Sequence, residues 1–118
     1  MNRIDLIYYK NKEIVRADFQ GLTEDDHLIA FMHEIDAYLK KLDRPMLRLT
    51  LIHGVYFTPK VMTHLPWVTK DLQNSTIKDA VVGVTGIKRI LLQSYDAIIP
   101  GRVKAFDSEE EAKEWLVL

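Results

Sequence analysis

The chain has 118 residues, and 47% of them are hydrophobic, which is enough to bury one core. Its 16 basic and 17 acidic residues give a formal net charge of -1, so it lacks the basic field that attracts nucleic acid. It has no cysteine, which excludes disulfides, thiolate catalysis and cysteine-bound metals. We expect a single domain over residues 1–118 that binds no nucleic acid and needs no cofactor.

The chain also lacks a signal for membrane insertion. Charged residues interrupt the apolar run at the N-terminus, unlike in a signal peptide, and no stretch reaches the apolar length that crosses a bilayer. We therefore expect a cytoplasmic protein without a transmembrane segment.

The first two elements are predicted to form a β-hairpin. Residues 3–9 and 13–19 both alternate between apolar and polar side chains, as strands with one buried face do. The polar turn 10–12 between them contains Asn11, which tolerates a positive φ.

An amphipathic helix is predicted next. Thr23 is the expected cap, and the helix begins at Glu24 and ends near Lys41, before the break at 43–45. Its apolar positions recur at helical spacing: Leu28, Phe31, Met32, Ile35, Tyr38 or Leu39, and Leu42.

A third strand is predicted over residues 46–53, followed by a short loop and a second helix. Thr58 is the expected cap of this helix, and Pro59 is its first residue. Its buried positions are Val61, Leu65, Val68 and Leu72, and Pro66 predicts a kink or two short helices.

The last forty residues predict strand, helix, strand, helix. Residues 77–85 are apolar on both sides, which is typical of a central strand, and Gly86 opens a helix. A short strand over 102–106 follows, and Ser108 with Glu111 forms a capping box for the final helix.

The predicted order is ββαβαβαβα, which indicates an α/β fold with a mixed sheet. Three strands place charges on one face, so we expect two layers, with helices mainly on one face and a partly open sheet on the other. The open face is predicted to carry a patch suited to self-association or to a partner. This patch comprises Tyr9, Ile14, Met46 and Ile52 among Arg3, Asp5, Arg16, Asp18 and Arg48.

Few residues point to chemistry. His27, His33, His53 and His64 do not fall at the i, i+4 spacing that puts two ligands on one helical face, so we expect no metal site. The strand-to-helix turn at 83–86 could hold an anion at Gly86 with Lys88 and Arg89, although it matches neither the P-loop nor the dinucleotide fingerprint.

Thr58 stands at the carboxyl end of a predicted parallel strand, where open α/β sheets place their sites. A helix cap explains the same residue without any function.

Two segments carry a family resemblance: DAVVGVTGIKRILL at 79–92 and VKAFDSEEEAKEWL at 103–116. Together with the element order, they resemble the STAS superfamily, the anti-sigma factor antagonist domains, and in particular its SpoIIAA-like branch. The resemblance implies a non-enzymatic module with a mixed sheet. It also implies a loop after the third strand whose serine or threonine is phosphorylated to switch partner binding.

In this chain the matching loop is 54–59, and Thr58 stands nearest the phosphoacceptor. A phosphate there would be favoured by the helix dipole and would place negative charge on a partner contact. Antagonists of the family carry an Asp-Ser-Ser-Gly or Asp-Ser-Thr-Gly motif at this place. This chain has VYFTPK at 55–60 instead, without the acid and the glycine.

We expect a non-catalytic module that binds a protein partner through Tyr56, Phe57, Thr58 and Lys60, with a homodimer left open. One alternative is a lipid or small-molecule binding module similar to the Sec14-type domain. Its cavity would lie near Phe31, Met32, Met62 and Trp67. A second alternative is an enzyme that acts on a phosphorylated metabolite at the 83–89 turn.

Overall fold

The computed structural model describes residues 3–64, 75–84 and 102–118. Its strands are β1 (Ile4–Tyr9), β2 (Lys12–Asp18), β3 (Met46–Leu51), β4 (Thr76–Val82) and β5 (Val103–Phe106). Its helices are α1 (Asp25–Leu42), α2 (Pro59–Met62) and α5 (Glu109–Leu116). The helix predicted from Gly86 and the kink predicted at Pro66 lie outside the described residues.

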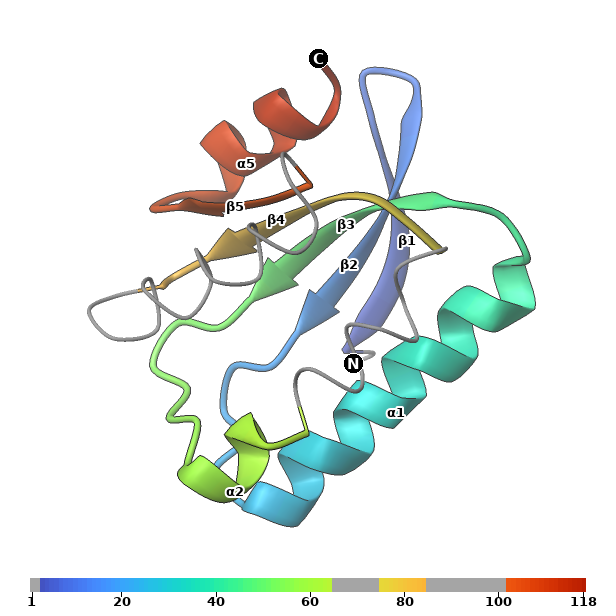
Figure 1. Cartoon of the computed structure of the whole chain (residues 1–118). Helices are drawn as coiled ribbons and strands as arrows, with labels where there is room; N and C mark the ends of the chain where they lie inside the picture. Colours follow the sequence, from blue (N-terminus) through green and yellow to red (C-terminus); the bar gives the residue numbers. More distant parts are fainter. Residues whose placement is uncertain (1–2, 65–74, 85–101) are drawn as a thin grey trace.

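The five strands form one sheet in the order β1-β2-β3-β4-β5. β1 pairs antiparallel with β2, and every later neighbour pairs in parallel (Figure 1). The predicted mixed α/β sheet with an antiparallel first hairpin is therefore confirmed.

The hairpin is tight because its turn contains two residues in the left-handed region. Lys10 has φ 49° and Asn11 has φ 67°, as a two-residue type I′ turn requires. The turn connects Tyr9 directly to Lys12, which is the first residue of β2. The predicted hairpin is thus present, with a turn one residue shorter than expected.

Helix α1 follows its sequence pattern closely. Asp25 and Asp26 lie in the first turn and Lys40 and Lys41 in the last, which suits the helix dipole. The cap is Glu24 rather than Thr23, and no side chain caps the helix by a hydrogen bond. Its buried residues are Leu28, Phe31, Met32, Ile35 and Leu39.

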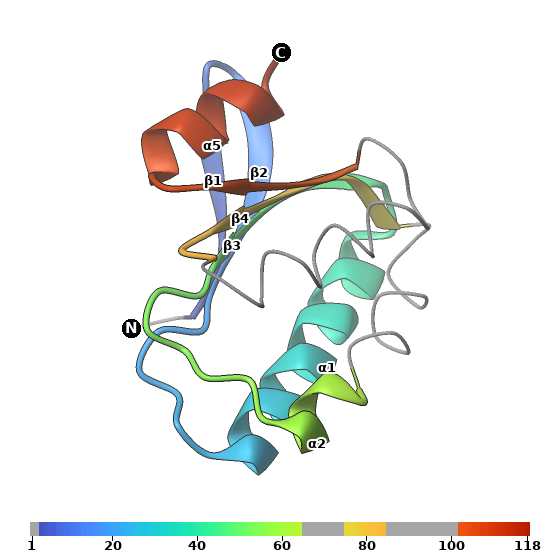
Figure 2. The same cartoon turned by 60° about the vertical axis from the view of Figure 1, so that its left-hand side comes forward.

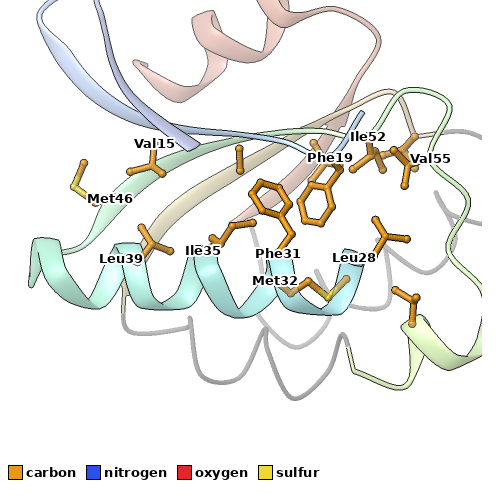
Figure 3. Close-up of a cluster of buried hydrophobic side chains, with 14 residues drawn as sticks. Val15, Phe19, Leu28, Phe31, Met32, Ile35, Leu39, Met46, Ile52 and Val55 are labelled. Atoms are coloured by element: carbon orange, nitrogen blue, oxygen red, sulfur yellow. The ribbon is translucent and has the colours of Figure 1, made fainter. Parts of the chain in front are cut away.

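Helices α1 and α2 lie on one face of the sheet, and α5 lies on the other (Figure 2). The α1 face contains an extensive apolar cluster in which the helix stripe packs against Val15, Phe19, Ile52 and Val55 (Figure 3). The α5 face contains a second cluster, formed by Ile14, Leu47, Leu49, Leu51, Ala80, Val82, Ala112 and Leu116. The face expected to be partly open is thus covered by the C-terminal helix where it crosses these strands.

The predicted patch of mixed apolar and charged residues is wrong. Ile14, Met46 and Ile52 are buried, and they lie on opposite faces of the sheet. The reason is the register between β2 and β3, in which Val15 is the partner of Arg48 and Ala17 the partner of Thr50. The apolar face of the hairpin therefore continues into the polar side of β3, while Leu47, Leu49 and Leu51 face α5.

In the part of the chain that the structure describes, no helix is long and apolar enough to cross a membrane.

Candidate functional site

The loop after β3 is shaped by two close backbone contacts. The amide of Ile52 donates to the carbonyl of Val82 at 2.9 Å, and that of Val55 donates to the carbonyl of Ile52 at 3.1 Å. The second bond closes a turn in which Gly54 has φ 70°. The chain thus leaves the carboxyl edge of the sheet and turns toward α2.

The loop alternates between anchored and exposed side chains. Val55 is buried in the core cluster of the α1 face, and the ring of Phe57 meets that of Phe19 edge-on at a centroid distance of 6.2 Å. Between them, Tyr56 is 71% exposed. The anchors on both sides present the Tyr56 ring to solvent.

Thr58 is the N-cap of α2, as predicted. Its backbone is extended, and its Oγ1 accepts a hydrogen bond from the amide of Val61 at 3.3 Å. Pro59 occupies the first turn, where its missing amide costs nothing. The half-buried hydroxyl of Thr58 thus has a structural role at the start of this short helix.

Lys60 joins α2 to the start of α1. Its Nζ lies 3.0 Å from Oδ1 of Asp26, and both side chains are exposed. This hydrogen bond and ion pair raise the pKa of Lys60 and lower the pKa of Asp26. The positive charge of Lys60 is therefore already paired within the chain.

The loops after β3 and β4 touch at Gly83. This glycine has φ 95°, and a Cβ placed on it would lie 2.7 Å from the backbone nitrogen of His53. Gly83 therefore serves a close approach of two backbones. Gly86, Lys88 and Arg89, the other members of the predicted anion turn, lie outside the described residues.

Three of the four residues of the predicted lipid cavity lie in the described part of the chain. Phe31 and Met32 are buried in the core cluster of the α1 face, Met62 is half-buried, and Trp67 lies outside the described residues. Within residues 3–64, 75–84 and 102–118, no three His, Cys, Asp or Glu side chains gather where they could hold a metal ion.

The sequence reasoning missed a polar cluster on the α1 face. Arg48 Nη1 lies 3.6 Å from Asp79 Oδ2, and Thr50 donates to Asp79 Oδ1 at 2.8 Å. All three side chains are largely buried. The sequence signal for this cluster was an acid at position 79, next to the apolar run of a predicted central strand, whereas its position opposite Arg48 is seen only in the structure.

Comparison with known proteins gives a fold and no function. No family model and no curated protein matches the chain. A solved structure does match: an uncharacterized protein from the DUF3478 family with a SpoIIAA-like fold, from Shewanella loihica PV-4. The TM-score is 0.68 at 15% sequence identity, over 96% of this chain and 91% of that one. The resemblance seen in the sequence is therefore confirmed at the level of architecture, and the chain has a SpoIIAA-like α/β fold.

Proposed function

We propose that the chain is a non-catalytic protein-binding module, and that its partner contacts the loop 53–58 together with α2. The observation that carries this proposal is the presentation of Tyr56, an exposed aromatic ring between the anchored residues Val55 and Phe57. Tyrosine is enriched among the residues that dominate binding energy at protein interfaces. A ring held by fixed neighbours also loses little conformational entropy on binding.

The polar groups of the loop support binding rather than catalysis. The Thr58 hydroxyl accepts the capping bond from Val61, and the Lys60 ammonium is paired with Asp26. These two groups thus stabilise the conformation of the loop and α2. Such polar groups are typical of the border of an interface, which surrounds its central residues.

Phosphorylation of Thr58 is the regulation we propose for this surface. A phosphate on Oγ1 would sit two residues from Tyr56 and would add roughly two negative charges to the contact area. The added charge would weaken the binding of a partner that packs against the uncharged ring of Tyr56.

The test is affinity capture from a lysate of the source cells, followed by binding measurements with each purified partner. We expect Tyr56→Ala to lose the partner that wild type captures. The control is Ile77→Ala, which truncates an exposed apolar side chain at the start of β4, and it retains the partner. Equal affinity of wild type and Tyr56→Ala for every captured protein contradicts the proposed surface.

The regulation is tested separately with Thr58→Glu and Thr58→Ala. We expect Thr58→Glu to lose the partner and Thr58→Ala to keep it once the circular dichroism spectra confirm that both variants fold. If both variants bind as wild type does, Thr58 is a helix cap without a switch.

A further inference from the structure

The outer edge of β1 is the feature that the proposed function leaves unused. β1 is the first strand of the sheet order, and among the described residues it pairs only with β2 (Figure 1). An edge strand carries a row of backbone donors and acceptors that another strand can pair with.

The hairpin determines which backbone groups face outward. The two-residue turn closes on Tyr9 and Lys12, which form a hydrogen-bonded pair, and such pairs alternate along an antiparallel ladder. The amide of Asp18 donates to the carbonyl of Arg3 at 2.8 Å, which agrees with an alternation that starts from a hydrogen-bonded pair at Tyr9 and Lys12. The amides and carbonyls of Ile4, Leu6 and Tyr8 therefore point away from β2.

Among the described residues this edge carries little of the usual protection against pairing, and Asp5 is the only charged residue of β1. Natural edge strands carry lysine, proline or a bulge, whereas β1 reads IDLIYY and pairs with β2 without a register shift. Its side chains also leave apolar surface available. Tyr8 is 68% exposed, and Leu6 is only half-buried although its ladder partner Val15 is fully buried.

We infer that a second copy of this chain pairs with β1, antiparallel about a twofold axis at Leu6. Opposite residues of a continuous sheet lie on the same face, so the two residue numbers of each pair must be both even or both odd. Centring the axis on Leu6 is the arrangement that pairs all three outward residues with one another. Leu6 then meets Leu6 of the second copy, and Ile4 meets Tyr8.

The charges of the strand suit this register. Asp5 lies opposite Ile7, and Arg3 lies opposite Tyr9, so no two like charges are directly opposed. The exposed ring of Tyr8 gains an apolar neighbour in Ile4 of the second copy. The product is a dimer with one continuous sheet through both protomers, and this pairing uses the same patch on each chain, as a twofold interface requires.

The mass in solution tests the dimer. We expect sedimentation analysis of wild type to give a dimer, and Tyr8→Lys to give a monomer, because lysine on an edge strand opposes pairing. The control is Tyr56→Lys, which makes the same substitution at an equally exposed tyrosine and keeps the dimer. The inference is overturned if wild type is a monomer, or if Tyr56→Lys dissociates as fully as Tyr8→Lys does. If wild type is a monomer, a peptide strand from another protein is left as the occupant of this edge.

A single introduced cysteine tests the register, because the chain has no other. In Leu6→Cys the two Cα atoms would lie about 5.5 Å apart, which suits a disulfide. In Asp5→Cys they would lie diagonally, roughly 7–8 Å apart, beyond the usual reach. We expect oxidation to cross-link Leu6→Cys and not Asp5→Cys. This test does not depend on whether the Tyr8→Lys variant folds. A dimer in which Leu6→Cys fails to cross-link overturns the pairing.

Discussion

The two faces of strand β3 are both buried, but their chemistry differs. Toward α5 the strand presents only Leu47, Leu49 and Leu51. Toward α1 it presents Arg48 and Thr50 between apolar residues, and both contact Asp79 of β4. One face is thus held by packing alone, whereas the other includes polar contacts that tie β3 to β4 at a defined register.

The border of the α5 face is polar in a different way. Tyr9 donates a hydrogen bond to Glu114, which also pairs with Lys10 at 2.7 Å, and Arg16 pairs with Glu109 at 3.1 Å. These contacts are at least partly open to solvent, where an ion pair contributes little. Burial of leucine and alanine therefore supplies most of the stability of α5, and the surface pairs orient it over the hairpin.

The largest expected effect comes from removing packing on the α5 face. Leu49 is fully buried, so Leu49→Ala is expected to lower the free energy of unfolding by about 2–5 kcal/mol through lost burial and a cavity. Urea denaturation measures the change. The control Leu118→Ala truncates an exposed leucine and is expected to have little effect. Equal stability of the two variants would contradict the apolar account of this face.

On the α1 face, Asp79→Ala removes the acceptor of Thr50 and the partner of Arg48. We expect a loss of about 3 kcal/mol, because truncating one member of a buried pair leaves the other charge uncompensated. The double variant Arg48→Met with Asp79→Leu should recover much of this loss, which thermal and urea unfolding can measure. If Asp79→Ala is as stable as wild type, the polar cluster does not stabilise the fold.

A smaller effect is expected where the two loops touch. Gly83→Ala would place a Cβ against the backbone of His53 and force a residue with φ 95° into strain, at a cost of roughly 1–3 kcal/mol. Gly54→Ala is the matched control, since Gly54 also has a positive φ but has nothing within 4 Å of its added Cβ. Gly83→Ala should therefore be the less stable variant, and the opposite order would contradict the close contact.

Local signals in the sequence predicted the elements well. Thr58 and Ser108 cap their helices as expected. An N-cap bond joins residues only three positions apart, so a short stretch of sequence is enough to predict it. The one-sided stripe of α1 and the alternation of the hairpin were equally local. Such patterns were enough to indicate the class of fold that the structural comparison confirms.

The faces of the sheet could not be predicted in the same way. Alternation in β3 separated Leu49 from Arg48, but it did not say which side would meet α1. That assignment depends on the register between β2 and β3 and on the position of α5, which are tertiary properties. For the same reason, the contact of Arg48 with Asp79 was missed, and Tyr56 was a candidate whose exposure only the structure shows.

The smallest expected effect concerns the hydrogen bond between Tyr9 and Glu114. This bond, with burial and the charge of Glu114, raises the pKa of Tyr9 to about 12, and Lys10 together with Tyr9 lowers the pKa of Glu114. The contribution of Tyr9 to stability is therefore complete below its unfolded pKa of about 10 and is lost as the pH rises toward 12. The contribution of Glu114 is lost at the opposite end, as the pH falls below its ordinary pKa.

Ultraviolet absorbance during an alkaline titration measures the ionisation of Tyr9 as the difference between wild type and Tyr9→Phe. In a Glu114→Gln background the same difference should shift to lower pH, toward the ordinary tyrosine pKa, because the acceptor and its charge are gone. An unchanged Tyr9 titration would mean that the hydrogen bond between Tyr9 and Glu114 does not hold α5 over the hairpin.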